Sequence, residues 1–202
     1  MSGIALIDYG AGNLTSVKKG LAAAGGVLFS PSSPDDLDRA SGIVVPGVGH
    51  FAATSSLGVP WKRAIRRRID DGVPVLGICL GMQWLFEGSD EAPELPGLGV
   101  IGGRCHRLQA ERPLKIPHVG WNTLDCHQPS TILAGVSDEP HVYFTHGFAA
   151  PVTDECVATC THGETFAAVV ERGCVFGVQF HPEKSSAAGL RLLRNFVELA
   201  NE

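Results

Sequence analysis

A cysteine stands at the centre of the stretch Gly77-Ile78-Cys79-Leu80-Gly81, directly after the mostly apolar residues 73–76. Gly-x-Cys-x-Gly is the pattern of a nucleophile elbow in which cysteine replaces serine. The tight turn from strand to helix needs small flanking residues, and it pushes the sulfur out above the end of the sheet. The sulfur also lies at a helix N-terminus, where a thiolate is favoured. We predict that Cys79 is a nucleophile, and a buried structural cysteine is the alternative.

A thiol nucleophile requires a base, and the base requires a partner that orients it. His181 and Glu183 stand two residues apart, on either side of Pro182. Pro182 disfavours the helical conformation at His181, so the segment is extended and the two side chains can approach each other. The carboxylate can then hold the imidazole in one tautomer and stabilise the imidazolium. We predict a catalytic triad of Cys79, His181 and Glu183.

Acyl chemistry also requires an oxyanion hole. The backbone N–H of Leu80, the residue after the nucleophile, is the first expected donor. The second is expected from Gly47 or Val48, in the segment Pro-Gly-Val-Gly at residues 46–49. Its glycines allow a peptide plane to turn toward a substrate, although an ordinary turn has the same composition.

The elements that position these residues alternate between strand and helix in the first half of the chain. We expect strands at 3–8, 27–29, 42–45 and 73–78, helices at 14–24 and 60–71, and a helical turn at 35–40. In the second half, short β-like runs at 99–101, 141–145, 166–170 and 175–180 precede a final helix at 185–200. The pattern predicts an α/β fold with an open, mostly parallel sheet flanked by helices and a mixed or antiparallel β portion in the C-terminal half. Residues 1–202 are expected to form a single domain.

Composition excludes several classes of function. The chain of 202 residues is 44% hydrophobic and 18% charged, with a net charge of −5, so neither nucleic acid nor an anionic membrane is an expected partner. The basic residues between 62 and 68 are interpreted as a solvated helix face. No run is apolar enough to span a bilayer, and no secretory signal opens the chain, so a cytoplasmic location is expected.

The remaining candidate ligand sites are weak. The six cysteines are scattered, which favours reduced thiols over a disulfide scaffold. Cys156, Cys160 and His162 could form half of a metal site, but no second ligand pair has suitable spacing, so no metal is expected. The Gly-Ala-Gly at residues 10–12 lacks the third glycine of a dinucleotide fingerprint, so no cofactor is expected either.

The Gly-Ile-Cys-Leu-Gly-Met-Gln stretch at 77–83, together with His-Pro-Glu at 181–183, resembles the signature of class I (triad) glutamine amidotransferases. That resemblance implies hydrolysis of L-glutamine to glutamate and ammonia through a cysteinyl acyl-enzyme. Further stretches resemble the glutaminase subunits of imidazole glycerol phosphate synthases, of histidine biosynthesis. They are Asp-Tyr-Gly-Ala-Gly-Asn at 8–13, Pro-Gly-Val-Gly at 46–49, Pro-His-Val-Gly-Trp-Asn at 117–122 and Tyr-Phe-Thr-His at 143–146.

The resemblance also implies the residues that bind glutamine. They are Gln83, Glu91 and the backbone at His146, Gly147 and Phe148. A carboxylate such as Glu91 suits the substrate's α-ammonium group. The chain departs from the family at Gly147 and Phe148, where Ser or Thr and then Tyr are more common. Main-chain contacts would survive this change, whereas a hydroxyl role would not.

The family delivers its ammonia to a separate cyclase subunit with a (β/α)₈ barrel, and the two subunits form a heterodimer. The cyclase combines ammonia with a phosphorylated ribulosyl intermediate to give imidazole glycerol phosphate and the aminoimidazole carboxamide nucleotide. The resemblance implies that Asn13 and Trp121 face this partner, with Trp121 near the ammonia passage. A core position is the alternative for Trp121.

Two other functions remain open from the sequence. One is the amidotransferase subunit of another synthase, such as anthranilate or aminodeoxychorismate synthase, although the Pro-His-Val-Gly-Trp-Asn stretch argues against it. The other is a non-catalytic regulatory protein on the same scaffold, although no member of the triad is missing.

Overall fold

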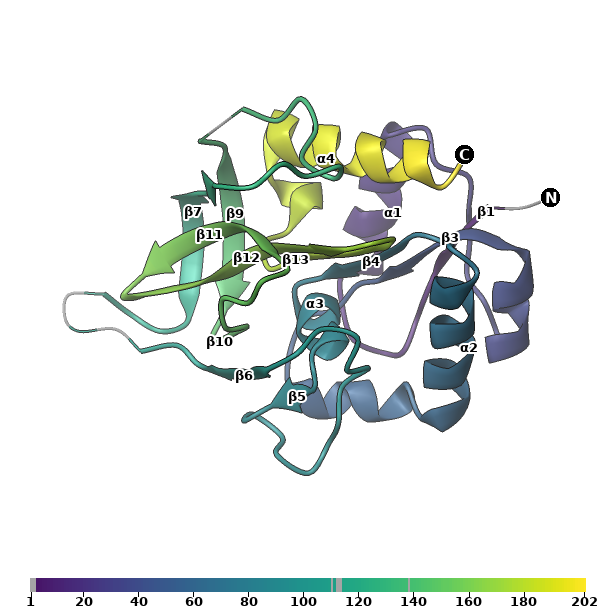
Figure 1. Cartoon of the computed structure of the whole chain (residues 1–202), viewed down its shortest axis with the longest axis horizontal. Helices are drawn as coiled ribbons and strands as arrows, with labels where there is room; N and C mark the ends of the chain where they lie inside the picture. The colour runs from purple at the N-terminus through teal and green to yellow at the C-terminus, as the bar shows by residue number, and fades with distance from the viewer. Residues whose placement is uncertain (1–2, 110, 112–113, 138) are drawn as a thin grey trace.

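The computed structural model describes residues 3–109, 111, 114–137 and 139–202 (Figure 1). Its helices are α1 (Leu14–Ala23), α2 (Val59–Asp70), α3 (Leu80–Leu85) and α4 (Ser186–Leu199), with 3₁₀ helices η1 (Pro34–Arg39), η2 (Phe51–Ser56) and η3 (Pro182–Lys184). The strands before residue 100 are β1 (Gly3–Leu6), β2 (Leu28–Phe29), β3 (Ala40–Val45), β4 (Val75–Ile78) and β5 (Gly88–Ser89). The later strands are β6 (Arg104–Arg107), β7 (His118–Thr123), β8 (Asp125–Cys126), β9 (His141–His146), β10 (Phe148–Ala149), β11 (Cys156–His162), β12 (Glu164–Arg172) and β13 (Val175–Val178).

The largest sheet has the strand order β2-β1-β3-β4-β13-β12-β11-β8. The first five strands in that order are parallel, and β12, β11 and β8 continue the sheet in antiparallel fashion. Two small sheets, β10-β6-β5 and β7-β9, complete the arrangement. The predicted fold class, an open and mostly parallel sheet with additional antiparallel β structure in the C-terminal half, is confirmed.

Alternating side chains of the parallel strands bury both faces of the sheet. Leu6, Val44 and Ile78 point into the core under α1 and α4, whereas Ile43 and Val75 point into the core over α2 and α3. Figure 1 shows the two layers, with α1 and α4 above the sheet and α2 and α3 below it. The buried positions therefore follow from the period-two pattern of each strand.

The predicted strand at residues 99–101 is wrong. The backbone N–H groups of Val100 and Ile101 both donate to the carbonyl of Leu85, at 3.0 and 3.2 Å, and Leu98 donates to Trp84. These carbonyls belong to the last turn of α3, which has no partners for them within the helix. The segment therefore caps a helix instead of joining a strand ladder.

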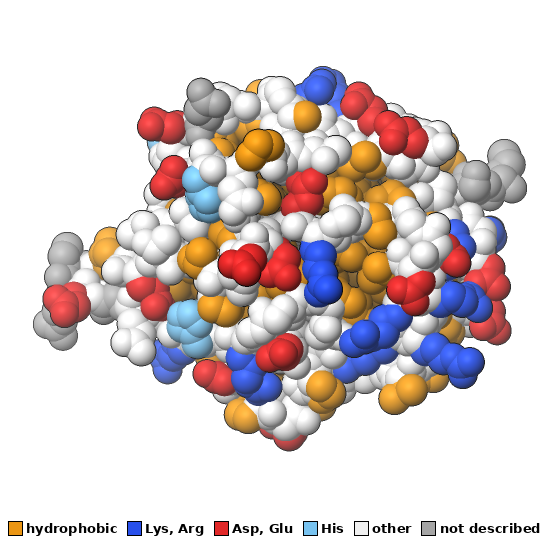
Figure 2. All heavy atoms as spheres, viewed as in Figure 1, with side chains coloured by type: hydrophobic (Ala, Val, Ile, Leu, Met, Phe, Trp, Pro, Cys, Tyr) orange, Lys and Arg blue, Asp and Glu red, His pale blue; other side chains and the backbone are white. Residues whose placement is uncertain are grey.

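The interpretation of the α2 basic residues as a solvated face is only partly correct. Lys62 donates to the carbonyl oxygens of Pro96 and Gly97 at 2.6 and 2.9 Å, and Arg66 donates to Leu98. These side chains therefore hold the 96–98 loop onto α2. Figure 2 shows the cluster of Lys and Arg over the α2 side of the molecule. Within the described residues, no helix combines the length and apolar character needed to cross a bilayer.

Candidate active site

Strand β4 runs directly into α3 through Cys79, whose backbone has φ 53° and ψ −106°. This positive φ is strained for a residue with a side chain. The flanking glycines make the turn possible, because a Cβ on Gly77 would lie 2.7 Å from the Gly81 carbonyl oxygen and a Cβ on Gly81 would overlap the Val45 carbonyl. The chain therefore forms the predicted elbow, with Cys79 at its corner.

The Cys79 thiol lies at the carboxyl end of β4 and is nearly buried, with 4% of the residue exposed. The side-chain amide of Gln179 approaches Sγ at 3.6 Å, and the Thr145 carbonyl lies 3.9 Å away. Gln179 was not among the predicted site residues. A polar residue at the end of the otherwise apolar strand β13 is the signal that could have identified it.

Hydrogen bonds hold the His181–Glu183 pair beside this elbow. His181 Nδ1 lies 2.9 Å from Glu183 Oε1, and the two side chains are 3% and 1% exposed. The His181 N–H donates to the Tyr143 carbonyl, and its own carbonyl accepts from the Ser185 hydroxyl at 2.7 Å. With the predicted geometry in place, Nδ1–H donates to the carboxylate and Nε2 is left for the reacting groups.

The electrostatics of His181 favour the imidazolium. Burial disfavours the charged form, but the neighbouring Cys79 and Glu183 outweigh burial and raise the pKa of His181 to about 9. His181 Nε2 and Glu183 Oε2 are buried without hydrogen-bond partners among the described residues. An imidazolium with a free Nε2–H is equipped to deliver a proton to a leaving group.

The N–H expected to serve as an oxyanion donor is occupied in this conformation. The Leu80 N–H, the first expected donor, is bonded to the Gly47 carbonyl at 3.3 Å. The Gly47 carbonyl therefore occupies the direction in which a substrate oxyanion would bind. The structure brings Gly47 and Val48 to the predicted place, next to the elbow, with their peptide plane turned the wrong way for oxyanion binding.

The predicted substrate residues surround one small cavity of about 40 Å³. Its walls are Gly49, Cys79, Leu80, Gln83, Glu91, Thr145, His146, Gly147 and Phe148. A cavity of this size holds at most a few water molecules.

Several polar groups around the cavity are already paired. The Phe148 carbonyl accepts from the Gln83 amide at 2.7 Å and pairs with His146 Nδ1 at 2.9 Å. The Gly147 carbonyl accepts from the Leu108 N–H, and Glu91 Oε2 accepts from the Phe51 N–H at 2.7 Å. Burial is the main cause that lowers the pKa of His146 to about 3, so its ring is neutral. The Gly147 carbonyl and the Glu91 carboxylate each keep a further acceptor site, so they can also bind a ligand without losing these internal bonds.

The two predicted interface residues lie at the surface. Asn13 is exposed and caps α1, accepting from the Ser16 N–H at 3.3 Å. Trp121 is 52% exposed, so the core alternative is wrong for it. Its ring packs edge-on against Tyr143 at 6.0 Å, on the β7–β9 sheet.

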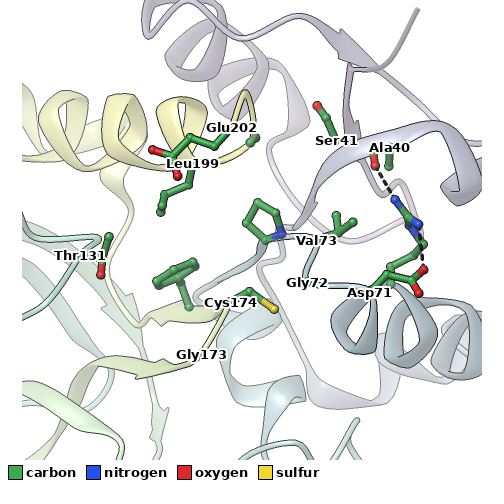
Figure 3. Close-up of a pocket in the computed structure, with 14 residues that line it drawn as sticks. Ala40, Ser41, Asp71, Gly72, Val73, Thr131, Gly173, Cys174, Leu199 and Glu202 are labelled. Carbon is green, nitrogen blue, oxygen red and sulfur yellow. Dashed lines mark hydrogen bonds and ion pairs between the residues drawn. The ribbon is translucent and has the colours of Figure 1, made fainter.

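A second cavity, of about 480 Å³, lies at the opposite edge of the main sheet (Figure 3). Ala40 begins β3, and Val73 and Cys174 precede β4 and β13, so these residues mark the amino ends of the parallel strands. Ligands of open α/β sheets bind at the carboxyl ends. The cavity of about 480 Å³ is therefore remote from Cys79.

Comparison with known proteins agrees with the resemblance found in the sequence motifs. The family model for "Glutamine amidotransferase class-I" matches residues 5–199. The chain is 45% identical to "Imidazole glycerol phosphate synthase subunit HisH" of Geobacillus kaustophilus, over 98% of this chain and 97% of that protein. It is 46% identical to the HisH subunit of Microcystis aeruginosa, over 98% and 96% of the two chains. A solved glutamine amidotransferase shares the fold with a TM-score of 0.76 at 21% identity, over 99% of this chain and 100% of that one.

Proposed function

The chain belongs to the class-I glutamine amidotransferases, among the HisH subunits of imidazole glycerol phosphate synthase, and we propose that Cys79, His181 and Glu183 hydrolyse L-glutamine to glutamate and ammonia. One observation supports these roles above all. A strained elbow presents a thiol next to a buried His–Glu pair, and residues suited to glutamine surround that thiol.

In the first half of the reaction, the Cys79 thiolate attacks the carboxamide carbon of glutamine. The carbonyl oxygen becomes an oxyanion, which the N–H groups of Leu80 and Val48 stabilise once the Gly47–Val48 peptide has turned. The C–N bond then breaks, and His181 Nε2–H gives its proton to the departing nitrogen, so ammonia leaves and a thioester remains.

In the second half, the now neutral His181 accepts a proton from water. The resulting hydroxide attacks the thioester carbon, the C–S bond breaks, and glutamate and the Cys79 thiolate are released. Glu183 remains ionised throughout, holding Nδ1–H and stabilising the imidazolium each time it forms. Ammonia, the product that leaves first, is the nitrogen source for a partner.

We further propose that the partner is a cyclase subunit with a (β/α)₈ barrel and that it covers the exposed face of β7. Val119 and Trp121 lie two residues apart on this strand, with 59% and 52% of each residue exposed. Trp121 packs on Tyr143, and Lys184 Nζ stands 5.8 Å from the same ring. Since Lys184 follows Glu183 directly, a protein bound here reaches the triad through adjacent residues.

Asn13 supports the same placement, because it caps α1, which also contacts η3. The helix that Asn13 caps packs against the triad, because a Cβ on Gly20 of α1 would lie 3.3 Å from Glu183 Cβ. Exposed apolar and aromatic residues around a functional centre are typical of protein interfaces. Asn13 and Trp121 would then flank the route along which ammonia passes to the cyclase.

Ammonia release from glutamine tests the proposal, measured for the chain alone and with a cyclase subunit plus its phosphorylated ribulosyl nucleotide. We expect low activity alone, strong stimulation by the liganded cyclase, and no release by Cys79→Ala in either state. Turnover by Cys79→Ala would contradict the mechanism. Equal wild-type activity with and without the cyclase would support the glutaminase activity but contradict the proposed partner. A chain that releases no ammonia even with the cyclase would be a regulatory protein.

A further inference from the structure

Tyr9 carries a buried hydroxyl that nothing in the described structure satisfies. The residue is 9% exposed, and its Oη has no hydrogen-bond partner among the described residues. A buried hydroxyl without a partner costs about 1–3 kcal/mol, so such groups are rare unless they serve another state of the protein. Tyr9 took no role in the mechanism above.

The hydroxyl lies against the oxyanion segment. A Cβ on Gly47 would overlap the Tyr9 hydroxyl, and on another side it would lie 2.9 Å from Leu80 Cβ. Tyr9 follows β1, Gly47 follows β3 and Cys79 follows β4, and these three strands are neighbours in the parallel part of the sheet. Figure 1 shows the three strands side by side, so their carboxyl ends meet at one edge.

The same hydroxyl is close enough to the nucleophile to respond to its charge. Burial is the larger cause that raises the pKa of Tyr9 above its ordinary value of 10.0, and the charge of Cys79 adds to it. Tyr9 is therefore a protonated phenol, which can donate a hydrogen bond but has no acceptor in this conformation.

Rotation of the Gly47–Val48 peptide would leave a carbonyl that needs a hydrogen-bond donor. When the Val48 N–H rotates toward the substrate, the Gly47 carbonyl loses the Leu80 N–H that it now accepts from. A buried carbonyl left without a donor would oppose the rotation. The unpaired Tyr9 hydroxyl thus lies beside the glycine whose carbonyl would lose its donor.

We propose that the Tyr9 hydroxyl donates a hydrogen bond to the Gly47 carbonyl when the Gly47–Val48 peptide rotates to form the oxyanion hole. Tyr9 is then a positioning residue for the oxyanion hole, without contact to the substrate. This inference rests on the proposed glutaminase function.

The test compares wild type with Tyr9→Phe, each with the cyclase and its nucleotide. We expect kcat for ammonia release to fall roughly three- to tenfold, with KM unchanged, because one neutral hydrogen bond is lost only in the active conformation. The melting temperature should be equal or higher, since the hydroxyl is unsatisfied at rest. Alkylation of Cys79 by iodoacetamide, which displaces iodide without forming an oxyanion, should keep its rate.

Thr153→Val is the matched control, since Thr153 Oγ1 is also buried without a partner among the described residues and belongs to the segment between β10 and β11. Its kcat should equal that of wild type. An unchanged kcat in Tyr9→Phe would overturn the inference, as would a lower melting temperature or slower alkylation, which would indicate a merely structural role. No ammonia release by wild type would overturn the proposed function itself, and the inference with it.

Discussion

The strain at Cys79 can be measured by replacing the residue with glycine and with alanine. Both variants remove the thiol, and both keep the backbone bonds from Cys79 N–H to the Val178 carbonyl and from Gln83 N–H to the Cys79 carbonyl. They differ in that alanine retains the Cβ that disfavours φ 53° and ψ −106°. The comparison therefore isolates the conformational cost of the elbow.

The expected difference follows from three opposing effects. Relief of a sparsely populated backbone conformation favours glycine by about 1–3 kcal/mol. The greater flexibility of glycine in the unfolded chain favours alanine by about 0.5–1 kcal/mol. Loss of one buried methyl group favours alanine by about 0.8 kcal/mol. We expect Cys79→Gly to be more stable than Cys79→Ala by about 0.5–1.5 kcal/mol, since a conformation this far from the allowed regions belongs at the upper end of the strain range.

Urea unfolding at constant m-value gives this difference directly, and it corresponds to roughly 2–4 °C in melting temperature per kcal/mol for a chain of this size. Ala22→Gly, at an exposed position of α1, is the control and should lose about 1 kcal/mol. The two sites should therefore rank glycine and alanine in opposite orders. Cys79→Ala equal to or more stable than Cys79→Gly would refute strain at the elbow.

Three other perturbations address the same site. Proton NMR titration of His181 should give a pKa of about 9 that falls toward 6.5 in Cys79→Ala. The pKa of His181 is higher in the folded protein than in the unfolded chain, so the stability that His181 contributes is fully present below pH 6.5 and is lost between pH 6.5 and 9. Over that window, wild type should therefore lose stability relative to Cys79→Ala. Val48→Gly should raise ammonia release by the isolated chain roughly 5- to 150-fold, because Val48 does not have a positive φ at rest and rotation of the peptide takes it there, where a β-branched residue costs about 1–3 kcal/mol. A slower variant would contradict this. Gly81→Ala should fold poorly or melt far below wild type, since its Cβ would overlap the Val45 carbonyl, and a wild-type melting temperature would count against the close packing of α3 on β3.

The elements that carry the proposed triad could be predicted from the sequence because local rules determine them. The apolar run before Cys79, the glycines on either side of it and the proline after His181 each restrict the backbone by sterics alone. The parallel part of the sheet followed from apolar runs alternating with amphipathic helices. These signals need no knowledge of distant partners.

What could not be predicted depends on contacts between distant segments. The 99–101 run is apolar like a strand, yet its N–H groups cap α3 because that helix ends beside it. Strand β7 has no clear period-two apolar pattern, and its pairing with β9 is visible only in three dimensions. Tyr9 is an ordinary residue in a glycine-rich loop until the fold sets its hydroxyl against Gly47. The orientation of the Gly47–Val48 peptide plane is likewise not determined by the local sequence.

If the proposed oxyanion hole is closed at rest, the free energy needed to open it sets the size of the control that a partner would have to exert. Opening the hole exchanges the Leu80–Gly47 hydrogen bond for the proposed bond from Tyr9, and it places Val48 at positive φ, which costs about 1–3 kcal/mol. A total of about 1–3 kcal/mol leaves the open conformation populated at roughly 15% to 0.6% in the isolated chain. A cyclase that binds the open conformation better than the closed one by a similar 1–3 kcal/mol would then bring the two conformations to equal populations. Glutamine hydrolysis would then be confined to complexes that can use the ammonia, through the rotation of a single peptide.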